Sequence, residues 1–353
     1  MLTVLQVAYA LGTVSADAVG GAEQVLAMLD RALVAAGHRS VVVACEGSRV
    51  AGSLRATPRS TGLLTPAART AAYAAHRREI AGAMAASPVD VVHFHGLDFA
   101  EYLPPPGVPV LATLHLPPSW YPSTVFTLDR PNTYLHCVSE AQRRACPTSP
   151  LLLPTIPNGV DVDRLRRSWR KRGFVAAVGR ICPEKGFHFA IDAARHARVP
   201  LRLAGRVFPY ESHQEYFARE IVPRLDRDRR FVGVVGFRAK RRLMGRARCV
   251  LVPSLAPETS SLVAMESLAC GTPVVAFPNG ALAEIIQPGK TGFLVSDARE
   301  MADAIHECAK LDPETCRETA RERFSAELMV RSYLNLYAGL AARFTSTRRE
   351  VAA

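Results

Sequence analysis

The sequence lacks the features that would place it in several protein classes. It has no run of about 18 apolar residues that could span a membrane. Its apolar start has no basic region before it, so we expect a first buried strand there and not a signal peptide. None of its eight cysteines stands in a CxxC pair, which disfavours a disulfide framework or a zinc site and favours reduced, buried thiols. A cytoplasmic protein is the expectation.

Acidic residues are scarce in the middle of the chain. Between residues 161 and 250 there are 23 Lys and Arg but only 9 Asp and Glu. This excess suits a polyanionic ligand, whether phosphate, an anionic lipid headgroup or nucleic acid, and it also fits a solvated arginine-rich surface. The basic stretch at residues 238–248 has no interleaved aromatics and no DNA- or RNA-binding pattern. We therefore expect no nucleic-acid partner and leave peripheral contact with the inner membrane face open.

Hydrophobic periodicity divides the chain into two alternating series of strands and helices. A chain of 353 residues exceeds what one core usually supports. In the first series, strands are predicted at residues 2–8, 40–44, 89–94, 108–114 and 134–138, and helices at residues 22–36 and 67–86. In the second series, strands are predicted at residues 174–178, 201–204, 249–253 and 273–277, and helices at residues 187–197, 214–225 and 261–269. Apolar strands that alternate with helices indicate parallel sheets covered on both faces.

A turn cluster at residues 154–159 separates the two series. We therefore expect an N-terminal Rossmann-like domain over residues 1–158 and a C-terminal one over residues 159–325. The helix predicted at residues 326–344 lies apart from the second series and is expected to pack back across the first domain. The fold class is α/β, with two doubly wound parallel sheets.

Three stretches have the composition of loops. Residues 47–65 are rich in Gly, Ser, Pro and Arg, and residues 104–109 carry three consecutive prolines. Residues 115–132 follow a predicted strand, have little periodicity and include Trp120 and Tyr121 among prolines. A long irregular segment after a strand is often a binding loop, so we expect these two aromatics to line a ligand site.

Ligands of open α/β sheets bind beyond the carboxyl ends of the strands. After the first strand, Gly20 and Gly21 open a helix, where a phosphate or sugar can approach backbone N–H groups, although a structural tight turn fits the pair equally well. After the strand at residues 174–178, Arg180 and Lys185 flank a proline-bearing turn. Both cations can point at one pyrophosphate, the arginine as a fork and the lysine as a point charge.

The strand at residues 249–253 is followed by a helix start rich in hydroxyls. Thr259 or Ser260 is the predicted N-cap. The N–H groups of Ser260, Ser261 and Leu262 would then form an anion site at the positive end of the helix.

Two carboxylates lie close to this anion site in the sequence. Glu258 precedes the helix and Glu266 lies within it. A carboxylate would repel a neighbouring phosphate unless it binds a neutral group. The hydroxyl groups of a sugar or a ribose are neutral hydrogen-bond donors that suit it. The arrangement therefore fits a sugar nucleotide better than a bare phosphate, while two solvated helix-end carboxylates remain the alternative.

The spacing of Glu258 and Glu266, continued by Ser267-Leu268-Ala269-Cys270-Gly271-Thr272-Pro273-Val274-Val275, resembles the signature of retaining GT-B glycosyltransferases, specifically glycosyltransferase family 4 (glycosyl transferases group 1). Further matches are Gly20-Gly21-Ala22-Glu23, Val91-Val92-His93-Phe94-His95-Gly96, Ile156-Pro157-Asn158-Gly159-Val160-Asp161, Gly179-Arg180 with Lys185-Gly186, and Pro288-Gly289-Lys290-Thr291-Gly292-Phe293-Leu294-Val295. The resemblance implies two facing Rossmann-like domains with a cleft between them, the donor in the C-terminal domain and the acceptor in the N-terminal one.

The resemblance also implies roles for individual residues. Arg180 and Lys185 would hold the donor pyrophosphate. Glu258 would contact the donor sugar, and Glu266 would bind the ribose hydroxyls. Gly20 or Gly21 would meet the diphosphate from the other domain, and His115 would lie beside the acceptor. Most family members have Glu-x-Phe-Gly before the helix, where this chain has Glu258-Thr259-Ser260-Ser261. Because hydroxyl residues replace an aromatic residue and a glycine there, the donor sugar of other family members is a weaker guide to the donor sugar of this chain.

The implied activity is that of a hexosyltransferase-type glycosyltransferase. It would move a sugar from a UDP- or GDP-sugar to an acceptor hydroxyl with retention, without a metal and without a cofactor beyond the nucleotide sugar. The product would belong to secondary metabolite, glycan or glycolipid biosynthesis, with a small diffusible acceptor favoured. A sugar-nucleotide epimerase of the same fold and a noncatalytic sugar-nucleotide-binding protein are the alternatives.

Two patterns imitate metal sites. Asp161-Val162-Asp163 has the form of a DxD motif, but it follows a turn and precedes a helix start, so we interpret it as a turn and cap. His93 and His95 lie two residues apart on a strand and share one face, yet no third ligand is evident. We expect no metal there, and we expect His95 to lie in the acceptor cleft together with Trp120 and Tyr121.

Overall fold

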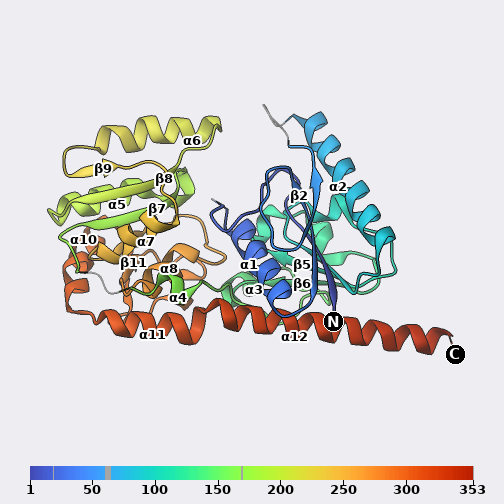
Figure 1. Cartoon of the computed structure of the whole chain (residues 1–353). Coiled ribbons are helices and arrows are strands. Elements are labelled where there is room, and N and C mark those ends of the chain that lie inside the picture. The colour runs from blue at the N-terminus through green and yellow to red at the C-terminus, as the bar shows by residue number, and fades with distance from the viewer. Residues whose placement is uncertain (19, 60–64, 168–169, 353) are drawn as a thin grey trace. The chain divides into compact units, whose positions relative to one another are not determined.

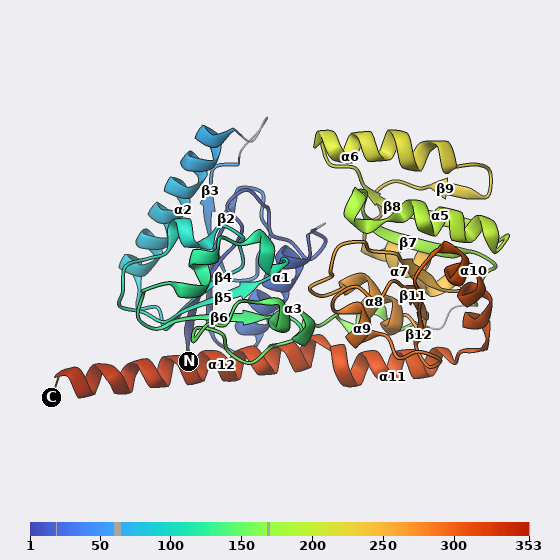
Figure 2. The same ribbon diagram turned by 180° about the vertical axis from the view of Figure 1, so that it is seen from behind.

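The computed structural model describes residues 1–18, 20–59, 65–167 and 170–352, with side chains described as far as residue 346. The chain forms two compact units, one made of Met1–Pro157 with Met329–Ala353 and the other of Asn158–Leu328. Each unit holds one six-stranded parallel sheet flanked by helices (Figures 1 and 2).

The sheet of the first unit has the strand order β3-β2-β1-β4-β5-β6. Its strands are β1 (Thr3–Val7), β2 (Arg39–Cys45), β3 (Ser53–Thr57), β4 (Val91–Phe94), β5 (Val110–Leu114) and β6 (Thr133–Cys137). Every residue of β4 and β5 is buried, as expected for central strands covered on both sides. The chain runs outward from β1 in both directions, so the strand order changes direction between β1 and β4.

Helices cover both faces of this sheet. They are α1 (Gly21–Ala35), α2 (Pro66–Ala86), α3 (Glu140–Ala145) and the long terminal helix α12 (Ala326–Ala352). Ile80 of α2 packs with Leu5 on one face, whereas Leu29 of α1 packs with Val4 on the other. Successive residues of β1 therefore point to opposite faces, as the period of a strand requires.

The helix α12 completes the core of the first unit. Tyr333 and Tyr337 are fully buried and pack in the same cluster as Val4 and Val91. The helix predicted at residues 326–344 thus packs against the first sheet, and it continues to Ala352.

The sheet of the second unit has the order β12-β11-β10-β7-β8-β9. Its strands are β7 (Val175–Arg180), β8 (Leu201–Arg206), β9 (Arg229–Phe231), β10 (Val250–Val252), β11 (Val274–Ala276) and β12 (Gly292–Leu294). Its helices are α4 (Val162–Leu165), α5 (Phe187–His196), α6 (Glu211–Tyr216), α7 (Phe237–Arg246), α8 (Leu262–Ala269), α9 (Leu282–Ile285), α10 (Ala298–Glu307) and α11 (Pro313–Phe324). The order changes direction between β7 and β10, so both units have the same doubly wound topology.

Several predicted elements differ from the structure. The loop predicted at residues 47–65 is wrong in part, because β3 pairs in parallel with β2 there, and residues 60–64 lie outside the described ranges. β3 escaped prediction because an edge strand needs only a few apolar residues. The helix predicted at residues 214–225 starts earlier, at Glu211, widens into a π-helix at Phe217–Ile221 and ends in a 3-10 turn at Val222–Arg224, which contains the proline at position 223. No helix in the described part of the chain is long and apolar enough to cross a bilayer.

Candidate functional site

The carboxyl ends of β7 and β10 form the edge of the second sheet where ligands of this topology bind. These two strands are neighbours and the chain diverges from them in opposite directions. Arg180 is the last residue of β7, and Ser254 follows β10 after one residue. The sequence-predicted donor residues of both loops therefore start from adjacent strand ends.

The loop after β7 is fixed to the loop after β10 through the backbone. The carbonyl of Glu184 accepts hydrogen bonds from the amides of Leu255 at 2.8 Å and Ala256 at 3.3 Å. Gly186 has φ +59°, and a Cβ on it would lie 2.2 Å from the carbonyl oxygen of Pro253. Only glycine can adopt this positive φ with the Pro253 carbonyl so close to its Cα. Gly186 therefore allows the two loops to approach each other this closely.

Lys185 and Glu258 form an ion pair across these loops. The lysine Nζ lies 2.5 Å from Oε1 of Glu258, and their side chains are 26% and 10% exposed. Ser254 donates a second hydrogen bond to the same carboxylate oxygen. The structure thus brings Lys185 to Glu258, while the guanidinium of Arg180 makes no hydrogen bond or ion pair with the residues described.

The backbone of Glu258 is held by a turn that sequence reasoning missed. Its amide donates to the carbonyl of Asn279 at 3.3 Å, and its carbonyl accepts from the amide of Ala281 at 2.8 Å. Gly280 has φ +65°, and a Cβ there would lie 2.3 Å from the Glu258 carbonyl oxygen. The Asn279-Gly280 pair after β11 is a turn signal that could have located this support.

The helix α8 starts one residue later than predicted. Ser261 is its N-cap and accepts from the amide of Ala264 at 3.4 Å, so the prediction of Thr259 or Ser260 as N-cap is wrong. Leu262 is the first helical residue, and the hydroxyl of Ser260 is buried without a hydrogen-bond partner among the described residues. The unpaired hydroxyl of Ser260 and the positive N-terminal end of α8 therefore lie within four residues after Glu258.

Glu266 is a buried carboxylate with one paired oxygen and one unpaired oxygen. It is 5% exposed, and its Oε1 lies 2.5 Å from the Nζ of Lys240 on α7. Its Oε2 is buried and has no hydrogen-bond partner in the described part of the chain. An unpartnered buried carboxylate oxygen is costly, which makes it a candidate acceptor for a ligand hydroxyl. The sequence reading placed Lys240 in a surface basic cluster and missed this pairing.

In the first unit, the predicted glycines stand at the start of α1. Gly20 is the N-cap position, and a Cβ on it would lie 1.9 Å from Oε2 of Glu23. The Glu23 carboxylate therefore folds back over the helix start, where the sequence predicts a phosphate. An acidic group in the first turn of a helix is electrostatically favourable.

His95 and His115 form a stacked pair beyond β4 and β5. The Nδ1 of His95 lies 3.0 Å from the Nε2 of His115, and the rings are 5.3 Å apart with an interplanar angle of 20°. Burial, with a smaller effect of His136, lowers the pKa of His115 to about 3. His95 is only 3% exposed and its Nε2 has no hydrogen-bond partner among the described residues, so this buried ring contacts His115 through its Nδ1 and its face. Its predicted place in the acceptor cleft is untested.

A buried hydrogen-bond network supports these histidines. The carbonyl of Cys137 can only accept, so His136 carries its proton on Nδ1 (3.0 Å) and its Nε2 accepts from the hydroxyl of Thr113 at 2.7 Å. Thr113 then accepts from His93 Nε2 at 2.6 Å and from the hydroxyl of Tyr333 at 3.1 Å. Tyr337 donates to the Nδ1 of His93 at 2.7 Å. The tautomers are thereby fixed, and His93 is not arranged to bind a metal.

The two predicted acceptor aromatics differ in position. Trp120 is 45% exposed, whereas Tyr121 is 6% exposed and its hydroxyl accepts from the amide of Leu116 at 3.3 Å. Trp120 is therefore available to a ligand, and Tyr121 closes its loop onto the core. Asp161 caps α4 by accepting from the amide of Arg164 at 3.1 Å, in keeping with the turn-and-cap interpretation.

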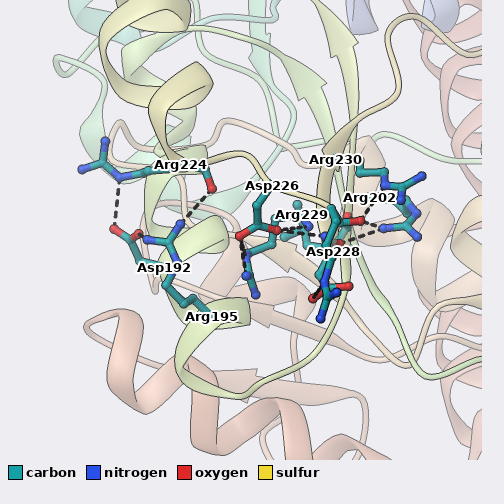
Figure 3. A network of polar contacts seen from close by, with 10 residues as sticks. Asp192, Arg195, Arg202, Arg224, Asp226, Asp228, Arg229 and Arg230 are labelled. Carbon is teal, nitrogen blue, oxygen red and sulfur yellow. Dashed lines mark hydrogen bonds and ion pairs between the residues drawn. The ribbon is translucent and has the colours of Figure 1, made fainter.

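Much of the basic charge around β8 and β9 is paired. Figure 3 shows Arg224 beside Asp192 and Arg229 beside Asp226. The Nε of Arg224 lies 3.3 Å from Oδ2 of Asp192, and the Nε of Arg229 donates to Oδ2 of Asp226 at 2.8 Å. Arg202 donates to the carbonyl of Asp228 at 2.8 Å. These arginines hydrogen bond to residues in turns and at helix ends. This part of the surface therefore has fewer unpaired basic groups for a polyanion than the count of charges suggests.

Comparison with known proteins connects both units to one enzyme class. A family model described as Glycosyltransferase Family 4 matches residues 19–164, and one described as Glycosyl transferases group 1 matches residues 172–310. A phosphatidyl-myo-inositol mannosyltransferase of Mycobacterium leprae is 31% identical over 164 residues, 42% of each chain. A D-inositol 3-phosphate glycosyltransferase of Nocardioides is 38% identical over 116 residues, 31% of this chain and 25% of its own. The matches span less than half the length of these curated relatives.

Solved structures match almost the whole chain. AviGT4, a glycosyltransferase involved in avilamycin A biosynthesis, has 26% identity and a TM-score of 0.71, covering 97% of this chain and 98% of its own. HepE from Anabaena, solved with UDP and glucose, has 19% identity and a TM-score of 0.73, covering 96% and 100%. The two family models together cover most of the chain, and the paired six-stranded sheets match these folds. The chain belongs to the GT-B glycosyltransferases, with a family 4 domain followed by a group 1 domain.

Proposed function

We propose that the chain transfers a sugar from a nucleoside diphosphate sugar to an acceptor hydroxyl with retention of configuration. The observation that carries this proposal is the charge arrangement at β7 and β10. Arg180 has no described ion-pair partner, whereas Glu266 has a buried oxygen without one. One group is suited to a phosphate and the other to a ribose hydroxyl, and a nucleoside diphosphate supplies both.

In this mechanism the cations stabilise the leaving diphosphate. Arg180 would hold it by a bidentate contact, and the start of α8 would add N–H donors near Ser261 and Leu262. Lys185 would share its charge between Glu258 and the diphosphate. Glu258 would accept a hydroxyl of the donor sugar with its carboxylate already fixed by Ser254 and Lys185.

Retention follows, in the proposal, from a front-face route in which the departing phosphate helps to deprotonate the acceptor. His115 would hydrogen bond near the reacting hydroxyl as a neutral imidazole, because its pKa lies far below neutrality. No metal or further cofactor enters this scheme. We propose a small diffusible acceptor, with Trp120 offering an exposed aromatic face to it.

A thermal-shift screen tests the donor assignment. Wild type is scanned with UDP, GDP, ADP and dTDP, each at a concentration far above the expected Kd. A concentration of about 100 Kd stabilises the bound unit by roughly 2.7 kcal/mol. The variant Arg180→Ala/Lys185→Ala should lose this response. The matched control Arg227→Ala/Lys310→Ala removes two exposed basic side chains from the same unit and should keep it.

If no nucleotide stabilises the wild type, or if the double variant responds equally, the donor assignment is wrong. Once a donor is found, the anomeric proton of the product distinguishes retention from inversion by NMR. An epimerase would instead convert the nucleotide sugar without an acceptor, and a noncatalytic binder would leave it unchanged.

A further inference from the structure

Cys182, Glu184 and His213 form a mixed cluster beside the donor loop. One potential ligand atom from each, a thiol sulfur, a carboxylate oxygen and an imidazole nitrogen, lies within 4.8 Å of the other two. Among the residues that the structure describes, this is the one group of three or more His, Cys, Asp and Glu with that spacing. The two flanking members are buried, and Glu184 is exposed.

The histidine of this cluster is held in position by aromatic contacts, but one of its ring nitrogens has no hydrogen-bond partner among the described residues. His213 is 8% exposed, and its Nδ1 is buried without a hydrogen-bond partner in the described ranges. Its ring meets those of Phe208 and Tyr210 edge-on, at 6.3 and 5.1 Å with interplanar angles of 82°. Two aromatic contacts therefore fix the imidazole, although its polar capacity is not satisfied.

The three side chains together match the ligand preferences of zinc. Thiolate, imidazole and carboxylate are the protein ligands of Zn²⁺, and three of them leave a fourth position for water. A tetrahedral zinc with bonds of about 2.0–2.3 Å needs ligand atoms roughly 3.5 Å apart, a spacing that lies inside the 4.8 Å limit within which these three atoms are found. The exposed side chain of Glu184 can rotate to adjust the position of its carboxylate oxygen.

Charge balance also permits a dication close to Arg180. The thiolate of Cys182 and the carboxylate of Glu184 together carry two negative charges, which neutralise Zn²⁺, and the imidazole is neutral. A neutral zinc complex adds no net repulsion to the arginine, whereas an unliganded dication would. The Sγ of Cys182 lies 3.7 Å from the carbonyl oxygen of Arg180, so the cluster is in direct contact with the backbone of that residue.

We propose that Cys182, Glu184 and His213 bind one Zn²⁺ ion, which ties the donor loop to α6. The first two residues lie between Arg180 and Lys185, and His213 lies on α6 after β8. The metal would stiffen the loop that presents both cations to the diphosphate. It would take no part in the transfer itself, and only its effect on the donor rests on the proposed function.

Metal binding is tested on the full-length protein after removal of metals with a chelator. Competition with a chromophoric zinc chelator should give one tight equivalent for wild type. Cys182→Ser and His213→Gln should each lose it, and Glu184→Gln should bind at least about tenfold more weakly. The control Cys146→Ser/His196→Gln changes the same residue types outside the cluster and should bind like wild type.

Cobalt substitution tests the thiolate ligand directly. Wild type with Co²⁺ should show a thiolate-to-cobalt charge-transfer band and tetrahedral ligand-field bands, both absent in Cys182→Ser. Glu184→Gln changes an exposed side chain, so it keeps the test valid even if a buried substitution prevents folding. Equal zinc binding by wild type and the cluster variants, or a cobalt complex without the thiolate band, overturns the proposal.

The coupling to the donor is measured separately. The thermal shift produced by UDP should increase when one equivalent of Zn²⁺ is present, and should not change in His213→Gln. Zinc binding with an unchanged UDP response overturns the coupling to the loop. Zinc binding with no response to any nucleotide supports the metal site and refutes only the donor assignment.

Discussion

The hydroxyl of Thr113 makes three hydrogen bonds inside the first unit, so its removal should strongly lower the free energy of unfolding of that unit. Thr113 is 1% exposed and lies on β5, two residues before His115. It donates to His136 and accepts from His93 and Tyr333. The substitution Thr113→Val keeps the shape of the side chain and removes only this hydroxyl.

The expected magnitude follows from the groups left without partners. Thr113→Val leaves three buried polar atoms unpaired, Nε2 of His93, Nε2 of His136 and the hydroxyl of Tyr333. Each costs about 1–3 kcal/mol, which gives roughly 3–9 kcal/mol for the set. Domains are commonly stable by only about 5–15 kcal/mol, so the first unit should be severely weakened or unfolded.

Two control substitutions isolate the hydroxyl network. Thr113→Ser retains the hydroxyl and loses one methyl group, which should cost about 1 kcal/mol. Thr133→Val, on the neighbouring β6, removes a hydroxyl whose described contact is with Arg130 at 3.2 Å. Because that guanidinium is partly solvated, the loss should be about 0.5–1.5 kcal/mol.

Hydrogen exchange measured by mass spectrometry gives the free energy of local opening for each segment. Peptides from β4, β5 and α12 should lose protection in Thr113→Val, because Tyr333 belongs to that helix, while peptides from the second unit keep theirs. A loss in Thr113→Val no larger than in Thr133→Val would refute the hydrogen-bond assignment and the histidine tautomers derived from it.

Acid should destabilise the first unit, because burial lowers the pKa of His76 and His136 to about 4 and that of His115 to about 3, against 6.5 for an unperturbed histidine. The unfolded chain then binds more protons below pH 6.5, so the stability is complete above that pH and falls towards pH 4, by up to about 1.4 kcal/mol per pH unit for each histidine. Denaturation of the first unit at pH 7, 6 and 5 checks this, and a midpoint independent of pH contradicts it. Gly186→Ala should shift the donor loop, since its Cβ would lie 2.2 Å from the Pro253 carbonyl at φ +59°. The nucleotide-induced thermal shift should fall several-fold, whereas Gly173→Ala, with open space around its Cβ, should leave it intact.

The sequence predicted the sheets better than their edges. Continuous apolar runs such as residues 108–114 belong to central strands, and these lie where expected. The edge strands β9 and β12 have three residues each, and β9 contains two arginines. The central strands β10 and β11 are equally short, but each lies in a buried apolar run that hydrophobic periodicity identifies. The positions of β9 and β12 come instead from backbone pairing with β8 and β11.

The candidate donor residues were predicted by type, but their partners were not. Nothing in the spacing of Lys185 and Glu258, 73 positions apart, indicates that they form an ion pair. The same holds for Lys240 and Glu266, which the packing of α7 beside α8 brings together. Pairings of this kind depend on tertiary contacts between loops and helices that a pattern along one chain does not contain.

These ion pairs explain how two carboxylates can stand at a phosphate site. Alone, Glu258 and Glu266 would repel a diphosphate at the start of α8. Each instead lies 2.5 Å from a lysine, so each pair is nearly neutral at longer range. The remaining charge comes from Arg180 and from the positive end of the helix, and both attract an anion. The carboxylates therefore keep their ability to accept hydroxyl hydrogen bonds without opposing the phosphates, as binding of a sugar nucleotide requires.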